Sequence, residues 1–192
     1  MKNILLALAL ACALFSNAQE SIEEPIKKNE ITSNLLDLVI AGSLNVTYER
    51  LFEKNQSMLV SATYFDTFGY YDAGFIDKST AFTLKAAYLI YFSKNKDHAG
   101  FFFYPQLKVR TGEITLDDYG FFNGNGDFVS QQEKYRIDGF SAGVGLGHQW
   151  VFNNTFSLTL FGEIARDLGN NSNKDFIDDV EPRFGVNFGI RF

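Results

Sequence analysis

The chain has 192 residues, of which 46% are apolar and 21% are charged, and its formal net charge is −6. Its mean hydropathy of −0.09 and its single long apolar run, at the N-terminus, exclude a bundle of membrane helices, each of which needs about 20 apolar residues. The acidic balance argues against nucleic acid as a partner, and the aromatic content of 16% argues against a disordered chain.

Residues 1–18 have the pattern of a secretory signal peptide. Lys2 gives a positive start, residues 4–15 are apolar, and small residues follow, as a signal peptidase requires. The one cysteine, Cys12, lies inside this segment, so we expect an exported mature chain without a disulfide or a cysteine metal site. Residues 19–29 are polar and charged and are expected to form a flexible N-terminal segment.

From residue 30 onward, apolar and polar residues alternate with a period of two, which predicts strands. The alternating segments are Glu30–Ile40, Leu44–Phe52, Met58–Tyr71, Thr80–Phe92, Gly100–Leu116, Tyr135–Phe152, Thr155–Leu168 and Val180–Phe192. Short polar turns alternate with longer connections rich in Gly, Asn and Asp, as in barrels whose strands cross a membrane. We therefore predict an all-β fold over residues 30–192, an eight-stranded antiparallel up-and-down transmembrane β-barrel whose first and last strands pair.

Alternation alone does not say which face points outward. In the segment 135–152, Phe140, Val144 and Trp150 share one face, and glycines and Gln149 share the other. A soluble lipocalin-like binder would place the apolar set inside. The export signal, the glycine-rich opposite face and the aromatic residues at strand ends favour an apolar face toward lipid. These aromatic residues, next to the short turns, form a predicted interface girdle: Phe52, Tyr91, Phe92, Phe101, Phe103, Trp150, Phe152, Phe156 and Phe192.

With this orientation, residues 30–192 resemble the small eight-stranded outer-membrane barrels of the OmpX, OmpW and OmpA type. The run Asn45-Val46-Thr47-Tyr48-Glu49-Arg50 is also similar to an uncharacterised family of short exported barrels that often carry a Tyr-Glu pair there. Phe188, Ile190 and Phe192 resemble the signal by which the barrel assembly machinery recognises the last strand. The resemblance implies a monomer in the cell outer membrane, with membrane lipid, lipopolysaccharide and the assembly machinery as partners.

The inward face of the predicted strands carries charges. They are Asp37, Glu49, Lys85, Lys108, Arg110, Glu163, Arg183 and Arg191. Eight strands leave an interior just wide enough for side chains to fill, and unpaired buried charges are costly, so we expect ion pairs with residual water that plug the lumen. We expect Glu163 near Arg183, because the last hairpin brings them together. The alternative is a charged, gated lumen.

No catalytic, cofactor or metal site is predicted. His98 is placed in a short turn, and His148 lies in the apolar register without a Ser or Thr two residues away, so only a triad assembled across strands would support an enzyme. The segment Asn123–Asp127 imitates a calcium loop, but Phe128 and Lys134 stand where Gly and Glu are needed, which favours a loop tip. There is no P-loop and no glycine-rich dinucleotide motif, so we expect no cofactor.

The longer connections offer two candidate surfaces. One is an acidic patch, interpreted as solvated or as bridging divalent cations to lipopolysaccharide phosphates: Asp175, Asp178, Asp179 and Glu181. The other is aromatic and either forms a binding surface or caps the barrel mouth: Tyr64, Phe65, Phe68, Tyr70, Tyr71, Phe75, Tyr119, Phe121, Phe122 and Phe128.

The leading hypothesis is a non-enzymatic integral outer-membrane barrel with a structural or surface-interaction role. The first alternative is a narrow channel or transport barrel for small or hydrophobic solutes. The second is a soluble periplasmic lipocalin-like binder.

Overall fold

The computed structural model describes residues 27–40, 42–64, 76–93, 98–116, 121–122, 124, 128–129, 133–169 and 180–192. Several predicted features lie outside these ranges: the signal peptide 1–18, most of the segment 19–29, and Asp175, Asp178 and Asp179. The calcium-like loop tip lies outside them apart from Gly124, and among the candidate loop aromatics only the side chain of Tyr64 is described.

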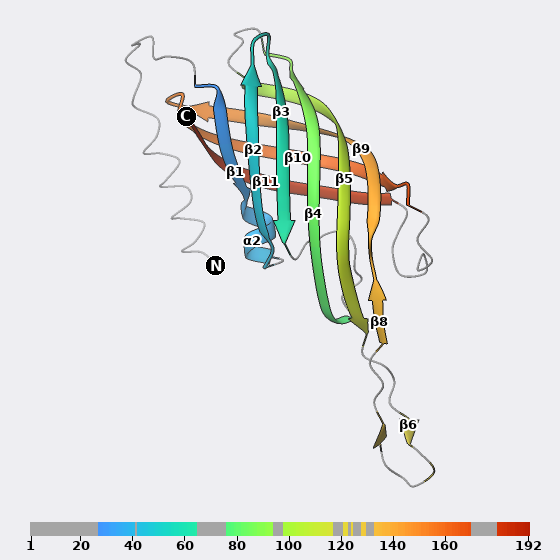
Figure 1. The fold of residues 1–192 in the computed structure, drawn as a ribbon. Helices are drawn as coiled ribbons and strands as arrows, with labels where there is room; N and C mark the ends of the chain where they lie inside the picture. Colours follow the sequence, from blue (N-terminus) through green and yellow to red (C-terminus); the bar gives the residue numbers. More distant parts are fainter. Residues whose placement is uncertain are drawn as a thin grey trace.

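Eight antiparallel strands form a closed barrel (Figure 1). They are β1 (Asn29–Asn34), β2 (Leu44–Phe52), β3 (Gln56–Tyr64), β4 (Ile76–Tyr91), β5 (Gly100–Leu116), β9 (Gly139–Phe152), β10 (Phe156–Asp167) and β11 (Val180–Arg191). Each strand pairs with the next in this order, and β1 pairs with β11 from Glu30 opposite Arg191 to Asn34 opposite Asn187. The predicted fold class and the pairing of the first and last strands are confirmed.

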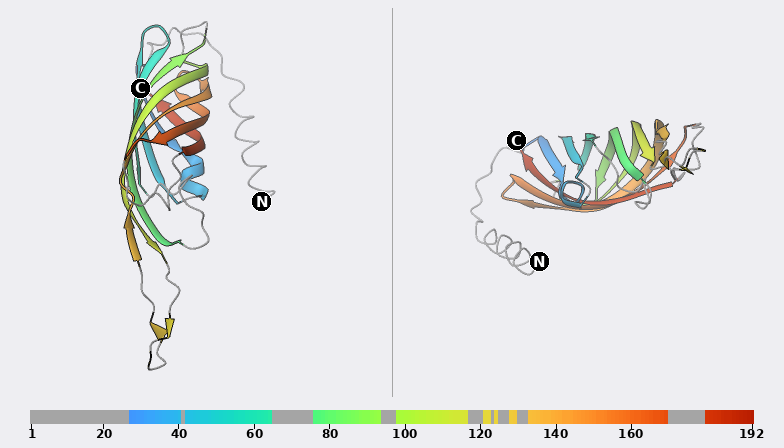
Figure 2. Two further views of the ribbon diagram at one scale, coloured as in Figure 1. Left: turned by 90° about the vertical axis from the view of Figure 1, so that its right-hand side faces the viewer. Right: turned by 90° about the horizontal axis from the view of Figure 1, so that it is seen from below.

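The two ends of the barrel differ. At the turn end, where β2 leads into β3 and β9 into β10, Asn55, Asn153 and Asn154 have positive φ, a conformation that asparagine tolerates in tight turns. At the opposite, loop end, β4 and β5 extend beyond the barrel and β5 also pairs with β8 (Glu133–Arg136). Figure 2 shows that this extension projects from the barrel, with a small hairpin of β6 (Phe121–Phe122) and β7 (Phe128–Val129) beyond it.

The predicted strand Tyr135–Phe152 is divided into β8 and β9. Both pair with β5 in one continuous register, in which Arg136 lies opposite Glu113 and Gly139 opposite Arg110. Between them the backbone N–H of Ile137 donates to the Gly112 carbonyl, so the ladder with β5 persists across the break.

The predicted first strand, Glu30–Ile40, is wrong beyond Asn34, because the chain turns into a short helix, α2 (Leu35–Ile40). The Asn34 Oδ1 accepts hydrogen bonds from the backbone N–H groups of Leu36 (3.0 Å) and Asp37 (3.4 Å), which is the behaviour of a helix N-cap. Asparagine therefore ends the strand, and the apolar residues that follow form a helix in place of the second half of β1.

The apolar face points outward, as predicted. Val144 and Leu146 of β9 are exposed, and so are Phe184 and Phe188 of β11, whereas Ser141 and Gln149 on the opposite face of β9 are each 2% exposed. Val186 is half-buried and shares the outward register of Phe184 and Phe188.

One member of the predicted girdle is misplaced. Tyr91 is 4% exposed and lies inside the barrel, because it is one residue out of phase with the outward-facing Ile90 and Phe92. The other members whose side chains are exposed include Phe52, Phe92, Phe101 and Trp150.

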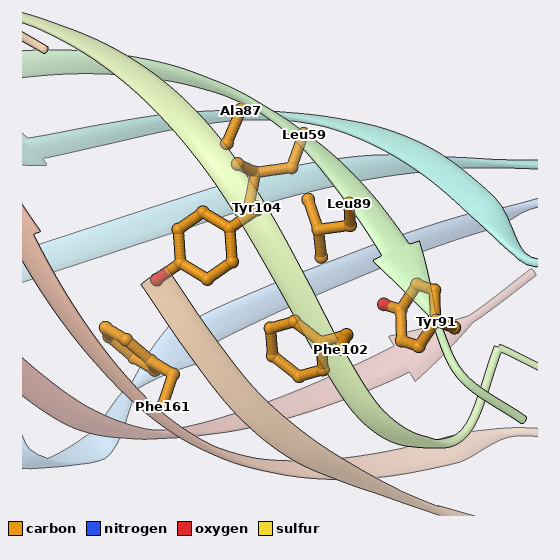
Figure 3. Packing of buried hydrophobic residues seen from close by; sticks show 7 residues of the cluster. All are labelled: Leu59, Ala87, Leu89, Tyr91, Phe102, Tyr104 and Phe161. Carbon is orange, nitrogen blue, oxygen red and sulfur yellow. The ribbon is translucent and has the colours of Figure 1, made fainter. Parts of the chain in front are cut away.

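The interior contains an apolar cluster in addition to its charges. Figure 3 shows its members, which come from β3, β4, β5 and β10: Leu59, Ala87, Leu89, Tyr91, Phe102, Tyr104 and Phe161. The aromatic rings of β5 need the glycines of β9 to fit. A Cβ at Gly145 would lie 2.1 Å from the Tyr104 ring, and one at Gly147 would lie 2.5 Å from the Phe102 ring. The glycine-rich inner face is therefore what makes room for these rings.

Among the described residues, no helix combines the length and hydropathy needed to cross a membrane.

Candidate functional site

The eight predicted lumen charges are all buried inside the barrel. Together with the inward-facing polar and charged residues they contact, they are called the lumen network here. It is arranged in three layers along the barrel: at the loop end, in the middle and at the turn end.

The layer at the loop end contains two cations that share one carboxylate. Glu181 accepts from Lys108 Nζ at 2.5 Å and from Arg110 Nη1 at 2.9 Å. Arg110 also donates to Asp167 Oδ2 at 3.3 Å and, through Nε, to the Ile137 carbonyl at 2.8 Å. Both cations of β5 are thus held by carboxylates of β10 and β11.

Glu181 was predicted to belong to a solvated acidic patch, and this is wrong. It lies in β11 and is 3% exposed. It shares the inward register of Arg183 and Gly185, so extending the alternation by one step would have identified it.

The middle layer holds two ion pairs. Glu163 lies directly opposite Arg183 in the β10–β11 register, which confirms that the two are neighbours. The carboxylate nevertheless accepts from Lys85 Nζ at 2.8 Å and from the Tyr104 hydroxyl at 2.7 Å. Arg183 instead forms an ion pair with Asp37 of α2. The strand register fixes which residues are adjacent, but Glu163 pairs with Lys85 of β4 from across the lumen, and Arg183 pairs with the helix that replaces the end of β1.

At the turn end, two acidic side chains are buried near one arginine. Glu30 accepts from Arg191 Nε at 2.7 Å, from Ser157 Oγ at 2.6 Å and from Gln149 Nε2 at 2.9 Å. Glu49 accepts from Ser57 Oγ and from the Tyr91 hydroxyl, at 2.5 and 2.7 Å. The two carboxylates are thus held mainly by neutral donors, with Arg191 as the ion-pair partner of Glu30.

The side chain of His98 lies at the turn end of the barrel. The side chain is buried, and its Nε2 lies 2.7 Å from the Phe52 carbonyl and 3.2 Å from the Gln56 carbonyl. The His98 carbonyl accepts from Arg191 Nη2 at 2.8 Å. This residue was predicted only as part of a turn, and the sequence offers no pattern that places its ring beneath the barrel.

The charges of the lumen are closely balanced. In the part of the chain that the structure describes, the inward set holds six acidic residues, namely Glu30, Asp37, Glu49, Glu163, Asp167 and Glu181, against the five predicted basic ones. The sequence prediction had three acidic residues because it left out Glu30, Asp167 and Glu181, which lie near strand ends.

Between the middle and turn-end layers lies a polar cavity. It leaves about 40 Å³ for the centres of water molecules, and one molecule needs roughly 10–15 Å³ on this measure. One part of its lining is polar and includes Thr32, Asn34, Asn187, Lys85 and Arg183 together with the acidic Glu30 and Glu49. The other part consists of members of the apolar cluster, among them Tyr91, Phe102, Tyr104 and Phe161. Thr32 Oγ1, Asn34 Nδ2 and Asn187 Oδ1 are buried without a hydrogen-bond partner among the described residues. The cavity therefore presents donors and acceptors to a small polar guest.

The two histidines lie in different environments, and His98 at the turn end is described above. His148 faces outward, with its ring centroid 4.6 Å from that of Phe101 and 4.3 Å from that of Trp150. Within the described ranges, no group of three or more His, Cys, Asp or Glu side chains is arranged to hold a metal ion.

Phe188, Ile190 and Phe192 occupy the outward face at the end of β11 and its last residue, and all three are exposed. They lie beside the β1–β11 junction that closes the barrel.

Among solved structures, the chain is similar to small outer-membrane barrels. It is 14% identical to the N-terminal β-barrel domain of Pseudomonas aeruginosa OprF, with a TM-score of 0.47, over 86% of this chain and 96% of that one. It is 16% identical to Ail, the attachment invasion locus protein of Yersinia pestis, with a TM-score of 0.47, over 86% of this chain and 97% of that one. At these identities the likeness concerns the fold alone. No family model matches the chain, and no curated protein matches it either.

Proposed function

We propose that the protein is a non-enzymatic integral barrel of the cell outer membrane, with a structural or surface-interaction role and a plugged lumen. The observation that carries this proposal is the inverted distribution of side chains: large apolar residues are exposed around the wall, while eleven charged residues of the described strands and α2 face inward. In hydrocarbon, a sheet is stable only when it is closed and its outer face is apolar.

The soluble lipocalin-like alternative required the apolar face inside, and the exposed positions of Val144, Phe184 and Phe188 argue against it. The channel alternative has one observation in its favour, the polar cavity between two layers of the lumen network. The loop-end pairs of Lys108 and Arg110 and the His98 ring at the turn end lie on either side of this cavity, and they support a plug.

The surface-interaction role rests on the extension of β4, β5 and β8. The strands continue past the loop end of the barrel and carry exposed polar side chains, including Thr111, Glu113 and Arg136. We propose that this extension lies outside the membrane and contacts lipopolysaccharide or another surface partner, that Phe188, Ile190 and Phe192 are read by the assembly machinery, and that the barrel is a monomer.

Location and conductance test the proposal together. The protein is expected in the outer-membrane fraction after carbonate extraction, with a band shift on heating that reports a closed barrel. Planar bilayers containing it should show little conductance, and Arg110→Ala should raise conductance several-fold while the band shift persists. A protein washed off by carbonate contradicts the membrane location, and a high conductance that Arg110→Ala leaves unchanged contradicts the plug.

A further inference from the structure

The barrel wall is not built of strands all the way round. The pairing of β1 ends at Asn34 opposite Asn187 of β11 and at Thr32 opposite Thr47 of β2. Toward the loop end, among the described residues, α2 occupies the space between β2 and β11, beside the end of β1 (Figure 1). This part of the wall, formed by Leu44–Val46, α2 and Val180–Val186, is called the seam here.

The sequence of β11 fits a free edge along the seam. Asn29 and Phe192 exchange backbone hydrogen bonds across the β1–β11 junction, so the even-numbered residues of β11 direct their backbone groups toward β1. Pro182 belongs to this set and has no N–H to offer. Proline is confined to such edges and interruptions because a central ladder needs its donor.

Hydrogen bonds join this region to β2. The backbone N–H of Ser43, which follows α2, donates to the Asp37 carbonyl at 2.9 Å, and Ser33 Oγ of β1 donates to the Asn45 carbonyl of β2 at 2.7 Å. Toward β11, the ion pair of Asp37 with Arg183 crosses the seam. On the outside, Leu35, Leu38 and Val39 are exposed, Val39 to 80%.

The outer and inner surroundings of α2 therefore differ in chemistry. Outside lies an apolar surface continuous with the exposed Leu44 and Phe184 of the adjacent strands. Inside lies the cavity, whose lining includes the ion-paired Arg183 and Lys85, the acidic Glu30 and Glu49, and buried polar atoms of Thr32 and Asn34 that have no partner among the described residues. In α2 itself, the carboxylate of Asp37 is the one polar side chain, and the other five residues are apolar.

We propose that the seam is a lateral entry from the membrane and that the cavity behind it binds the carboxylate head group of a single-chain amphiphile. The head group takes the place of Asp37 on Arg183 and accepts from Asn34 Nδ2 and the Thr32 hydroxyl, while the acyl chain lies against Leu35, Leu38 and Val39. Arginine favours such a group because its guanidinium pairs with a carboxylate in bidentate geometry. The inference rests on the proposed membrane location.

In this arrangement the Asp37 carboxylate competes with the carboxylate of the ligand for Arg183. A ligand shifts α2 away from Arg183 only by binding the opened state more tightly than the closed one. Removing the carboxylate of Asp37 lowers that cost, so Asp37→Asn is expected to bind the amphiphile more tightly than the unaltered chain.

The test is saturable binding of radiolabelled laurate to the full chain in phosphatidylcholine nanodiscs, with empty nanodiscs as the blank. Asp37→Asn is expected to tighten binding about tenfold and Arg183→Gln to abolish it, since each changes one charge-assisted contact. Thr32→Val, which keeps the side-chain volume, should weaken binding several-fold. The control is Arg136→Gln, which removes an exposed arginine of β8 outside the cavity lining and should leave binding unchanged.

Acetate and dodecyltrimethylammonium separate the two parts of the proposal. Neither should compete with laurate, because acetate lacks the acyl chain and the ammonium lacks the carboxylate. Competition by acetate at the same concentrations would overturn entry from lipid. Absence of saturable laurate binding in both the unaltered chain and Asp37→Asn would overturn the site, as would unchanged binding in Thr32→Val together with Arg183→Gln. A band shift on heating is recorded for every variant, so loss of the barrel is distinguished from loss of binding.

Discussion

The wall formed by β4, β5, β9 and β10 differs from the seam between β2 and β11 in how its interior is filled. On the first, Tyr104 and Phe102 pack onto glycines of β9. At the seam, Glu181 of β11 pairs with Lys108 and Arg110 at the loop end, and below it lie small polar side chains, the cavity and the ion pair of Arg183 with a six-residue helix. Closure of a barrel thus does not require uniform packing. We infer that the closely packed wall contributes more to the free energy of unfolding than the seam does, and that the seam deforms more easily.

The largest expected effect is at the shared carboxylate of the loop-end layer. Glu181→Gln leaves two buried cations, Lys108 and Arg110, without their principal partner, and breaking a buried pair in this way costs about 3–5 kcal/mol. Urea unfolding of the refolded barrel, followed by the heat-dependent band shift, measures the free energy of unfolding. Glu113→Gln, which alters an exposed carboxylate on β5, is the control and should change it by less than about 0.5 kcal/mol. Equal effects of the two variants would contradict the account of the loop-end layer.

A smaller effect is expected at the glycines of β9. A Cβ at Gly145 would lie within 2.6 Å of three atoms of the Tyr104 side chain, so Gly145→Ala must displace a buried ring, at a cost of about 1–3 kcal/mol. The matched control is Gly162→Ala on β10, where a Cβ meets nothing within 4 Å. A difference near zero between the two alanine variants would show that the interior is not close-packed at Tyr104.

The ion pair of Asp37 with Arg183 is expected to contribute less to stability than the pairs of Glu181 at the loop end. Asp37→Asn leaves Arg183 beside a cavity with room for water, so its charge stays partly solvated, and we expect a loss of about 1–2 kcal/mol rather than the larger cost of a dry pair. The same urea titration measures it. A loss as large as that of Glu181→Gln would contradict the distinction between a dry pair at the loop end and a partly solvated pair beside the cavity.

The smallest effect is expected outside the barrel, at Asp138. Hydrogen bonding from the Thr111 hydroxyl lowers the pKa of this carboxyl from 3.8, and Arg136 contributes to the same direction. A lowered folded-state pKa gives stability that is present above the unfolded pKa and is lost as pH falls through the folded one. Since the group is exposed, Asp138→Asn should shift the urea midpoint only slightly at pH 7, and the shift should diminish as the pH falls below 3.8. A large shift at any pH would contradict a solvated extension.

The alternation of side chains sufficed to predict the strands, their outward face and the adjacency of Glu163 and Arg183. It failed where local chemistry interrupts it. The run from Leu35 to Ile40 is apolar enough for a strand or a helix, and the N-cap at Asn34 decides between them. Tyr91 was assigned to the girdle by its aromatic type although its phase is inward. Lys85 pairs with Glu163 from across the lumen, and Arg183 pairs with Asp37 of a helix that was expected to be a strand, so strand order alone does not identify these partners.

The central claim, that the apolar face of the wall meets lipid while the charges lie inside, is tested most directly by the chain's single tryptophan, Trp150, on the outward face of β9. In vesicles of phosphatidylcholine brominated on its acyl chains, its fluorescence should fall several-fold relative to unbrominated vesicles, with little quenching by aqueous iodide. A Val144→Trp, Trp150→Phe protein should behave the same way at greater depth. Quenching of both proteins by iodide and of neither by brominated lipid would contradict the account.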